Sequence, residues 1–217
     1  MTLLFAVLAV ASYLLGSIPT SFLAARYGAG IDLRTVGSRN LGATNLFRVL
    51  GWRYAIPVVI LDAAKGAIPV LLFASIADRG PVAAMLLGLA AIIGHVFSVF
   101  VRFKGGKGVA TSAGAVMGLA PLAFLVTLVV FTITVRLSGY ASLGSILGAV
   151  AFPIAVRVIQ PSSDEVFWFG VILFVLITAF HHANIRRLLS GTESRIGQIQ
   201  KPAAIENEAG ASGGGPA

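Results

Sequence analysis

Long apolar stretches separated by short polar segments dominate the sequence. Apolar runs cover Met1–Ala25, Ala55–Ala77, Val82–Val101, Val109–Val135, Leu143–Val158 and Val166–Ala179. Most of these runs approach the roughly 20 residues that a helix needs to cross a bilayer. The first run has no basic residue before it, and Arg26 follows it, so it is interpreted as a span and not as a signal peptide. The pattern predicts a bundle of transmembrane helices.

Composition supports this class and excludes several kinds of chemistry. Hydrophobic residues make up 57% of the chain, charged residues only 11%, and the mean hydropathy is +0.93. Such a balance is typical of a polytopic membrane protein, and 217 residues leave no room for a separate soluble domain. The absence of cysteine excludes disulfides and thiolate nucleophiles. Three histidines with few clustered acids argue against a metal site, so no metal and no cofactor is expected.

The distribution of cations favours one topology. A single span over 109–135 would place the C-terminal arginines on the face opposite Arg26 and its neighbours, against the positive-inside rule. A break near Gly118 and Pro121 puts 13 of the 16 cations on one face. The sequence therefore predicts an all-α bundle of about seven helical segments, with the N-terminus outside and the C-terminus in the cytoplasm.

On this topology four polar segments, 37–48, 104–111, 138–145 and 181–197, meet at the cytoplasmic face. The first packs small donors and backbone-exposing glycines into a short stretch, which suits a pocket for an anionic ligand. Its polar residues include Ser38, Asn40, Thr44, Asn45 and Arg48. A helix here would place Thr44 and Arg48 on one face. The alternative is a solvated loop whose arginines only obey the positive-inside rule.

The second segment, Phe103–Thr111, is rich in glycine and lysine. Gly105, Gly106 and Gly108 are expected to expose backbone N–H groups, while Lys104 and Lys107 add positive charge, a combination suited to phosphate. A basic interfacial anchor is the alternative, although anchoring does not require three glycines. The spacing does not match the P-loop of nucleotide hydrolases.

Further polar residues occur at helical spacing. His181 and Asn184 are three positions apart and share a helix face, although a histidine at a helix end is often only a cap. Asp62 and Lys65 have the same spacing inside a span, where they are expected to neutralise one another; a proton or ion relay is the alternative. The segment from Ser142 to Ser145 taken alone indicates no more than a helix contact.

In chain order, these motifs resemble one bacterial family. They are Leu15–Thr20, Gly37–Arg48, Leu61–Gly66, Gly94–Phe97, Phe103–Thr111, Ser142–Ser145 and His181–Leu188. Together they resemble the acyl-phosphate-dependent glycerol-3-phosphate acyltransferases, the PlsY family, over most of the chain. Arg39 stands where that family usually has glycine, and Ser98 where a proline is common.

The resemblance implies transfer of a fatty acyl group from acyl phosphate to the sn-1 hydroxyl of glycerol 3-phosphate, which gives lysophosphatidic acid and phosphate, the first acylation step of phospholipid synthesis. By resemblance and position, glycerol 3-phosphate is held by Ser38, Arg48, Lys107, His181 and Asn184, of which the last three are the catalytic candidates. The acyl-phosphate site is lined by Thr44, Asn45, Gly105, Gly106 and Ser145. Asn40, Lys104, Gly108 and Ser142 complete the substrate-binding set.

An acyl phosphate already carries a good leaving group, and the chain shows no Ser-His-Asp arrangement, so direct attack without an acyl-enzyme is expected. The hydroxyl proton goes either to His181 or to a substrate phosphate oxygen. The expected partners are the two substrates and membrane lipid, with no nucleic acid. A multi-pass monomer in the bacterial inner membrane is expected, with its active site facing the cytoplasm.

A transporter for a phosphorylated solute is the alternative, because transporters build midplane sites from broken helices such as the one expected near Pro121. Against it, the cationic motifs gather at one face and no inverted repeat is apparent. A membrane anchor without activity would not need three glycine-rich polar motifs. The functional domain is expected to span residues 1–201, followed by a disordered tail rich in Ala, Gly and Glu over 202–217.

Overall fold

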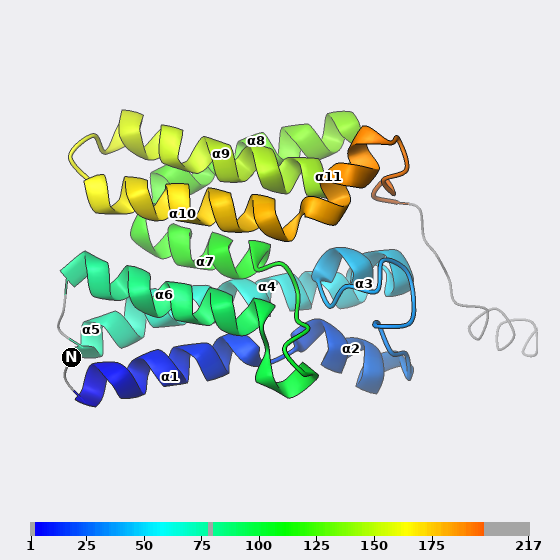
Figure 1. Ribbon diagram of the computed structural model, residues 1–217, viewed down its shortest axis with the longest axis horizontal. Coiled ribbons are helices and arrows are strands. Elements are labelled where there is room, and N and C mark those ends of the chain that lie inside the picture. The colour runs from blue at the N-terminus through cyan, green and yellow to red at the C-terminus, as the bar shows by residue number, and fades with distance from the viewer. Residues whose placement is uncertain (1–2, 78–79, 198–217) are drawn as a thin grey trace, which may run out of the picture.

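The computed structural model describes residues 3–77 and 80–197, and these form helices without any strand (Figure 1). This confirms the predicted all-α class. In chain order the elements are α1 (Leu3–Ser17), α2 (Thr20–Ala29), α3 (Ala43–Leu50), α4 (Trp52–Ile68), the π-helical turn η1 (Pro69–Phe73), α5 (Ala74–Ala77), α6 (Gly80–Val96), the short 3₁₀ helix η2 (Val99–Val101), α7 (Val109–Leu119), α8 (Pro121–Ser138), α9 (Ala141–Ile159), α10 (Asp164–Phe180) and α11 (His182–Leu189).

Several of these helices are able to cross a membrane. Within the described residues five helical stretches are long and apolar enough, and α10 with α11, joined by a 63° bend, raises the number to six. The five stretches are Leu3–Ala29, Trp52–Ala77, Gly80–Val101, Pro121–Ser138 and Ala141–Ile159. The polytopic bundle is therefore confirmed. The number of crossings and the orientation of the termini stay predictions.

The expected break in the fourth apolar run is present. Helix α7 ends at Leu119, Ala120 adopts the non-helical dihedrals φ −148° and ψ 75°, and Pro121 begins α8. Proline suits the first helical position because it has no N–H to leave unpaired there. The break makes α7 a short helix of 11 residues that is separate from α8.

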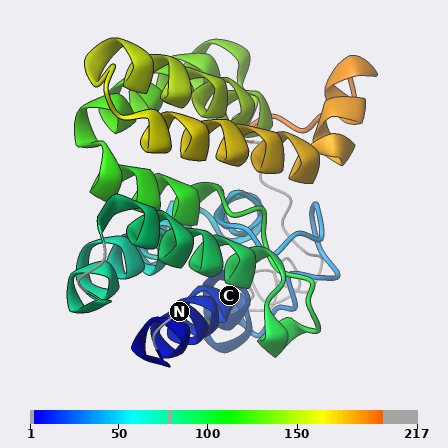
Figure 2. The same cartoon turned by 60° about the vertical axis from the view of Figure 1, so that its left-hand side comes forward.

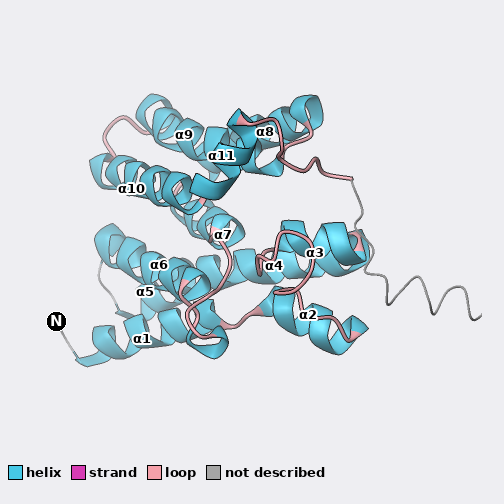
Figure 3. Ribbon diagram, turned by 45° about the vertical axis from the view of Figure 1, so that its right-hand side comes forward, coloured by secondary structure: helices cyan, strands magenta, loops and turns pink. Residues whose placement is uncertain are grey.

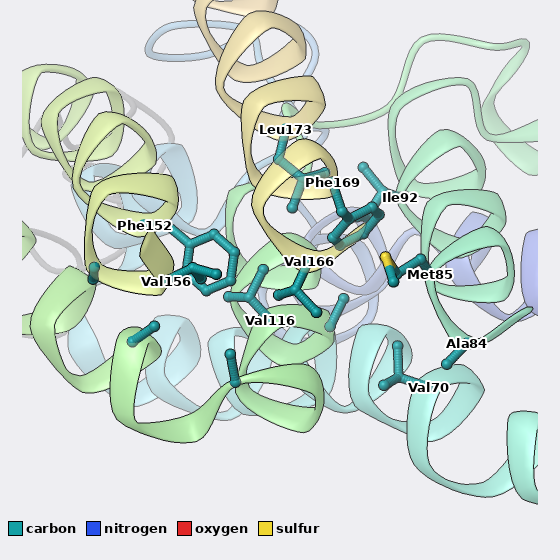
Figure 4. Packing of buried hydrophobic residues seen from close by; sticks show 14 residues of the cluster. Val70, Ala84, Met85, Ile92, Val116, Phe152, Val156, Val166, Phe169 and Leu173 are labelled. Carbon is teal, nitrogen blue, oxygen red and sulfur yellow. The ribbon is translucent and has the colours of Figure 1, made fainter. Parts of the chain in front are cut away.

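The helices form two groups with α7 between them (Figures 1 and 2). One group contains α1, α4 and α6, and the other contains α8, α9 and α10. Apolar side chains from α6, α7, α9 and α10 meet in one core cluster, which includes Val116, Phe152, Phe169 and Leu173 (Figure 4). Burial of this cluster holds the two groups together around α7.

Helix α7 approaches α4 closely because glycine lies on both sides of the contact. A Cβ on Gly66 would lie 1.9 Å from the carbonyl oxygen of Thr111, and one on Gly114 would lie 1.8 Å from that of Ala63. Small residues of this kind let membrane helices pack backbone to backbone. The close packing fixes α7, and with it the loop that precedes it.

A buried polar cluster joins α4 to the break between α1 and α2. Lys65 Nζ lies 2.5 Å from Asp62 Oδ1 and donates to the carbonyl oxygen of Ile18 at 2.7 Å. Thr20 also donates to Asp62, and His95 Nδ1 of α6 lies 3.7 Å from the same carboxylate. The expected mutual neutralisation of Asp62 and Lys65 is thus confirmed.

Three connections gather at one end of the helices (Figure 3): the α2–α3 loop, the α6–α7 loop and the segment after α11. The last segment returns to the start of α9, where the Ile196 N–H donates to the Gly139 carbonyl at 2.7 Å. The polar segments singled out in the sequence therefore meet in space. The expected tail, 202–217, and the domain boundary at 201 lie outside the described residues.

Candidate active site

A cavity of about 410 Å³ opens where these connections meet. Its polar end is formed by the α2–α3 loop, α3, the start of α7, the start of α9 and the α10–α11 junction. Its other end runs between α7, α8, α9 and α10 and is lined by apolar side chains, among them Val116, Leu128, Phe131, Phe152 and Leu173. A cavity that joins a cationic end to an apolar end suits a ligand with an anionic head and an apolar chain.

Most residues expected at the site line this cavity. They are Ser38, Asn40, Thr44, Asn45, Arg48, Lys107, Gly108, Ser142, Ser145, His181 and Asn184. The cavity lining that the structure describes does not include Lys104, Gly105 or Gly106. Of these three, Lys104 is exposed to solvent.

Glu193 is the centre of a hydrogen-bond network at the polar end. Its Oε1 accepts from Asn184 Nδ2 at 2.7 Å and from Ser142 Oγ at 2.9 Å, and its Oε2 accepts from Arg187 Nε at 2.7 Å. Burial opposes ionisation of Glu193, but the hydrogen bonds from Asn184, Arg187 and Ser142 outweigh that effect and hold its pKa below the usual value. The carboxylate therefore stays charged and ties α9 to α11.

Lys107 extends this network into the cavity. Its ammonium group donates to Asn184 Oδ1, and the other side of that amide is held by Glu193. Burial lowers the pKa of Lys107 to about 8, Glu193 opposes the shift, and Arg187 and Arg48 add to it. Lys107 is thus a positioned cation that an incoming anion would stabilise.

The lowered pKa of Lys107 predicts a pH dependence for any activity at this cavity. We expect kcat/KM for the anionic substrate to fall as pH rises above about 8, because deprotonation of Lys107 removes a positive charge from the free enzyme. Steady-state kinetics between pH 6 and pH 10 (roughly the range that brackets this pKa) measures the fall. A Lys107→Arg variant keeps its charge throughout this range. Any activity that it retains should therefore not fall as the pH rises above about 8. If kcat/KM of the arginine variant fell in the same way at alkaline pH, the group that titrates would be one other than Lys107.

The tautomer of His181 follows from its position. His181 Nδ1 lies 2.7 Å from the carbonyl oxygen of Ile177, one turn earlier in α10. A carbonyl only accepts, so Nδ1 carries the proton and Nε2 of the neutral ring keeps its lone pair. His181 is 3% exposed and lines the cavity. It is therefore able to accept a proton from a group bound there.

The α2–α3 loop is held by Asn45. Its Oδ1 accepts from the Ser38 N–H at 2.8 Å, and its Nδ2 lies within 3.3 Å of three carbonyl oxygens of the segment 33–40. The amide of Asn45 is committed to the loop, so its contribution is to hold Ser38 and Asn40 at the mouth. This differs from the direct contact with acyl phosphate that was expected of it.

Arg48 of α3 lines the cavity on the same side as the α2–α3 loop. Its Nη2 donates to the Ser194 carbonyl at 2.7 Å, whereas its Nε is buried without a partner in the described residues. The side chain is 5% exposed. A buried guanidinium with a free donor at a cavity is well suited to bind an oxyanion.

The two glycines of the α6–α7 loop have a packing role. The Gly105 N–H donates to Val96 O at 2.9 Å, and the Gly106 N–H donates to His95 O at 3.1 Å. A Cβ on Gly105 would lie 2.0 Å from the His95 carbonyl oxygen. Their N–H groups are therefore bound to α6, which corrects the expectation that they cradle a phosphate. Glycine is required because the loop lies directly on α6.

Residues around the start of α7 line the cavity instead. Lys107, Gly108, Val109 and Ala110 all line it. The first N–H groups of a helix have no intrahelical acceptor, and the helix dipole favours negative charge at this end. Phosphate binding by this segment stays a prediction, and the lining of the cavity favours the start of α7 over Gly105 and Gly106 for it.

Both departures from the resembling family have a local explanation. Arg39 has φ +59°, a left-handed conformation that glycine adopts more readily, so the usual glycine fits the backbone better. Ser98 has φ −66°, which proline also adopts, and its hydroxyl donates to the Ser17 carbonyl at 2.5 Å. That hydrogen bond ties the end of α6 to α1.

An Arg39→Gly variant should be more stable than the natural chain. The left-handed conformation costs a side-chain-bearing residue about 1–2 kcal/mol, which exceeds the roughly 0.5–1 kcal/mol by which glycine favours the unfolded chain. Thermal unfolding in detergent at a fixed scan rate should show a higher midpoint. Arg39→Ala keeps the strained backbone and should show no such gain. Equal gains in both variants would assign the effect to the lost charge.

Sequence reasoning did not place five polar residues that line this cavity at the site: Asp62, His95, Ser112, Thr127 and Glu193. Glu193 is the only acid between His181 and Gly197, and that isolation among cations was the available signal. Ser112 follows the glycine-rich segment directly, lines the cavity and is 3% exposed. No feature of the neighbouring sequence identifies Ser112 as a site residue, because its position at the cavity depends on which face of α7 points toward the cavity.

Several known proteins resemble this chain in sequence and in fold. The family model described as glycerol-3-phosphate acyltransferase matches residues 6–191. The chain is 42% identical to the glycerol-3-phosphate acyltransferase of Chlorobaculum tepidum, over 89% of this chain and 97% of that one. It is 46% identical to the enzyme of the same name from Chlorobium phaeobacteroides, over 89% of this chain and 96% of the relative.

Two crystal structures resemble the fold closely. One is PlsY, an integral membrane glycerol 3-phosphate acyltransferase, in its glycerol 3-phosphate form, with a TM-score of 0.83 and 37% identity over 90% of this chain and 96% of that one. The other is PlsY in its lysophosphatidic acid form, with a TM-score of 0.80 and 34% identity over the same shares.

Proposed function

Because the chain belongs to the PlsY family of glycerol-3-phosphate acyltransferases, we propose that it transfers a fatty acyl group from acyl phosphate to the sn-1 hydroxyl of glycerol 3-phosphate. The products are lysophosphatidic acid and phosphate. The observation that carries the proposal is the cavity itself, which joins a cationic end to an apolar end. Both substrates are anionic, and one carries a long apolar chain.

Glycerol 3-phosphate binds at the polar mouth. Arg48 and Lys107 hold its phosphate, with Ser38 at the edge of the loop. The network through Asn184 and Glu193 keeps Lys107 in place before the substrate arrives. Cations that are already held in place lose little conformational entropy when the anion binds, and no reorganisation energy is needed for them to stabilise its charge.

Acyl phosphate binds deeper in the cavity. Its phosphate meets the N–H groups at the start of α7, and its chain follows α7 toward Phe152 and Leu173. This arrangement places the reactive carbonyl between the deeper anion site and the apolar end of the cavity. Loss of one donor to the developing charge should lower the rate about 10²- to 10³-fold.

The acyl group is transferred directly. The glycerol hydroxyl oxygen attacks the carbonyl carbon, the bond from that carbon to the phosphate oxygen breaks, and phosphate leaves. His181 Nε2, whose lone pair is free, takes the hydroxyl proton and passes it to the departing phosphate. Neither a metal nor an acyl-enzyme is required, because the mixed anhydride already carries a good leaving group.

Labelled acyl phosphate tests the direct route. Incubated with the purified enzyme without glycerol 3-phosphate, it should leave no label on the protein after denaturation. Addition of glycerol 3-phosphate should then move the label into lysophosphatidic acid in a single turnover. Covalent label that forms before the second substrate and is chased into product would replace the direct route with an acyl-enzyme.

We propose that the enzyme is a multi-pass monomer in the bacterial inner membrane, with the cavity mouth facing the cytoplasm, because the basic segments gather at that end. The broken helix pair at Ala120 is the feature that favours a transporter of a phosphorylated solute instead. Vesicles containing the protein separate the two functions. Accumulation of unmodified labelled glycerol 3-phosphate inside them, without lipid product, would support the transporter.

A further inference from the structure

One buried hydroxyl inside the cavity has no hydrogen-bond partner among residues 3–77 and 80–197. Ser112 of α7 lines the cavity and is 3% exposed, and its Oγ has no partner within the described part of the chain. A buried hydroxyl without a partner is unfavourable, and native proteins rarely keep one without a reason. An acceptor on a ligand in the cavity would supply the missing hydrogen bond.

The other hydroxyls along the cavity differ from Ser112. Ser38 and Thr44 lie at the mouth, where both residues are exposed to solvent. The deeper ones already donate their protons: Ser142 to Glu193 at 2.9 Å, Ser145 to the Ala141 carbonyl at 2.9 Å and Thr127 to the Ala123 carbonyl at 3.1 Å. Among the cavity residues that the structure describes, Ser112 is thus the buried hydroxyl whose proton is available.

Ser112 lies at the boundary between the two ends of the cavity. It follows Gly108 by one helical turn, about 6 Å along the axis of α7. Val109 and Val116 share its face and line the cavity above and below it. On one side are the N–H groups at the start of α7, and on the other side is the apolar end that leads to Phe152.

We propose that the Ser112 hydroxyl donates a hydrogen bond to the carbonyl oxygen of the acyl phosphate and stabilises the charge that forms there. The inference rests on the proposed function. When the phosphate lies at the start of α7 and the chain lies in the apolar end, the carbonyl that connects them falls beside Ser112. A donor placed where negative charge develops is among the most effective catalytic devices.

The electrons and protons of the step balance without any change in Ser112. The glycerol oxygen forms a bond to the carbonyl carbon, and the C=O electron pair moves onto the oxygen that faces Ser112. That pair returns as the bond between the carbonyl carbon and the phosphate oxygen breaks. The proton of the glycerol hydroxyl leaves with phosphate by way of His181, and Ser112 keeps its own proton.

Kinetics of a Ser112→Ala variant test the inference. We expect kcat to fall about 10²-fold, with the KM for glycerol 3-phosphate changed by less than about threefold, because the lost contact belongs to the acyl group. The matched control is Thr111→Val. Thr111 is the preceding residue and is fully buried; within the described part of the chain its hydroxyl also has no partner, and it is not among the residues that line the cavity. It should keep kcat within about threefold of the natural enzyme.

Binding of two unreactive analogues isolates the carbonyl contact. A 2-oxoalkylphosphonate keeps a carbonyl near that of acyl phosphate, whereas an alkylphosphonate of the same length has none. Ser112→Ala should weaken inhibition by the keto analogue about fivefold, the effect of one neutral hydrogen bond, and leave the alkyl analogue unchanged. A merely structural role for Ser112 would weaken both equally.

Two results would overturn the inference. One is a Ser112→Ala enzyme with kcat within about threefold of the natural one, and the other is an equal loss in Ser112→Ala and Thr111→Val. Failure of the proposed function would look different, because the natural enzyme itself would then make no lysophosphatidic acid from acyl phosphate. The natural enzyme is therefore assayed first in every series.

Discussion

A Gly105→Ala variant is expected to lose about 10²-fold in kcat/KM for glycerol 3-phosphate while still folding. The added Cβ would lie 2.0 Å from His95 O and 2.8 Å from Val96 O, and both are backbone atoms of α6 that cannot rotate away. The loop has to move instead. Lys107 follows two residues later, and a displacement of about 1 Å at a positioning group is enough for a loss of this size.

Gly16→Ala is the matched control for this variant. Its Cβ would also lie 2.0 Å from a backbone oxygen of α6, that of Ala91, but Gly16 does not line the cavity. Both variants should unfold at lower temperature, since overpacking typically costs about 1–3 kcal/mol. Activity per folded molecule should fall only in Gly105→Ala. Equal losses of activity would show that a general disturbance of α6, and not the position of Lys107, limits catalysis.

A Lys65→Met variant should lose about 3–5 kcal/mol of stability, the usual effect of breaking a buried ion pair by removing one partner. Asp62 is 1% exposed, and its Oδ1 lies 2.5 Å from Lys65 Nζ, so the variant leaves a carboxylate without its cation inside the bundle. The Ile18 carbonyl loses its donor as well. Unfolding in mixed micelles measures the difference.

The double variant Asp62→Leu with Lys65→Met should recover much of that loss, because it removes both charges together. The exposed pair Arg34–Asp32 is the control. Its atoms are 2.6 Å apart, yet Arg34→Met should cost no more than about 1 kcal/mol, because solvent screens that pair. Full stability of Lys65→Met alone would contradict a stabilising role for this ion pair and would favour the alternative that the pair serves as a proton or ion relay.

The membrane helices, the break after α7 and the pairing of Asp62 with Lys65 were predictable from local sequence patterns. Apolar length identifies the membrane helices, and Pro121 marks the break after α7 because proline ends one helix and begins the next. The pairing of Asp62 with Lys65 followed from their spacing and from the cost of an isolated charge in a membrane. These features depend on neighbours in sequence.

The site was predictable only in part, because its details depend on contacts between distant segments. The spacing of Gly105 and Gly106 suggested exposed N–H groups, whereas α6 accepts both of them. Asn45 looked like a ligand contact, but its amide holds its own loop. Glu193 acquires its role from α9 and α11, which no local pattern links to it.

Transfer of labelled glycerol 3-phosphate into lipid by the purified protein tests the central claim most directly. Three donors of one chain length are compared: an acyl phosphate, the acyl-CoA thioester and the acyl carrier protein thioester. We expect lysophosphatidic acid from acyl phosphate alone, because the deeper anion site and the direct route suit a donor that carries its own phosphate leaving group. Equal product from a thioester would contradict the proposed donor, and no product from any donor with folded protein would contradict the enzyme itself.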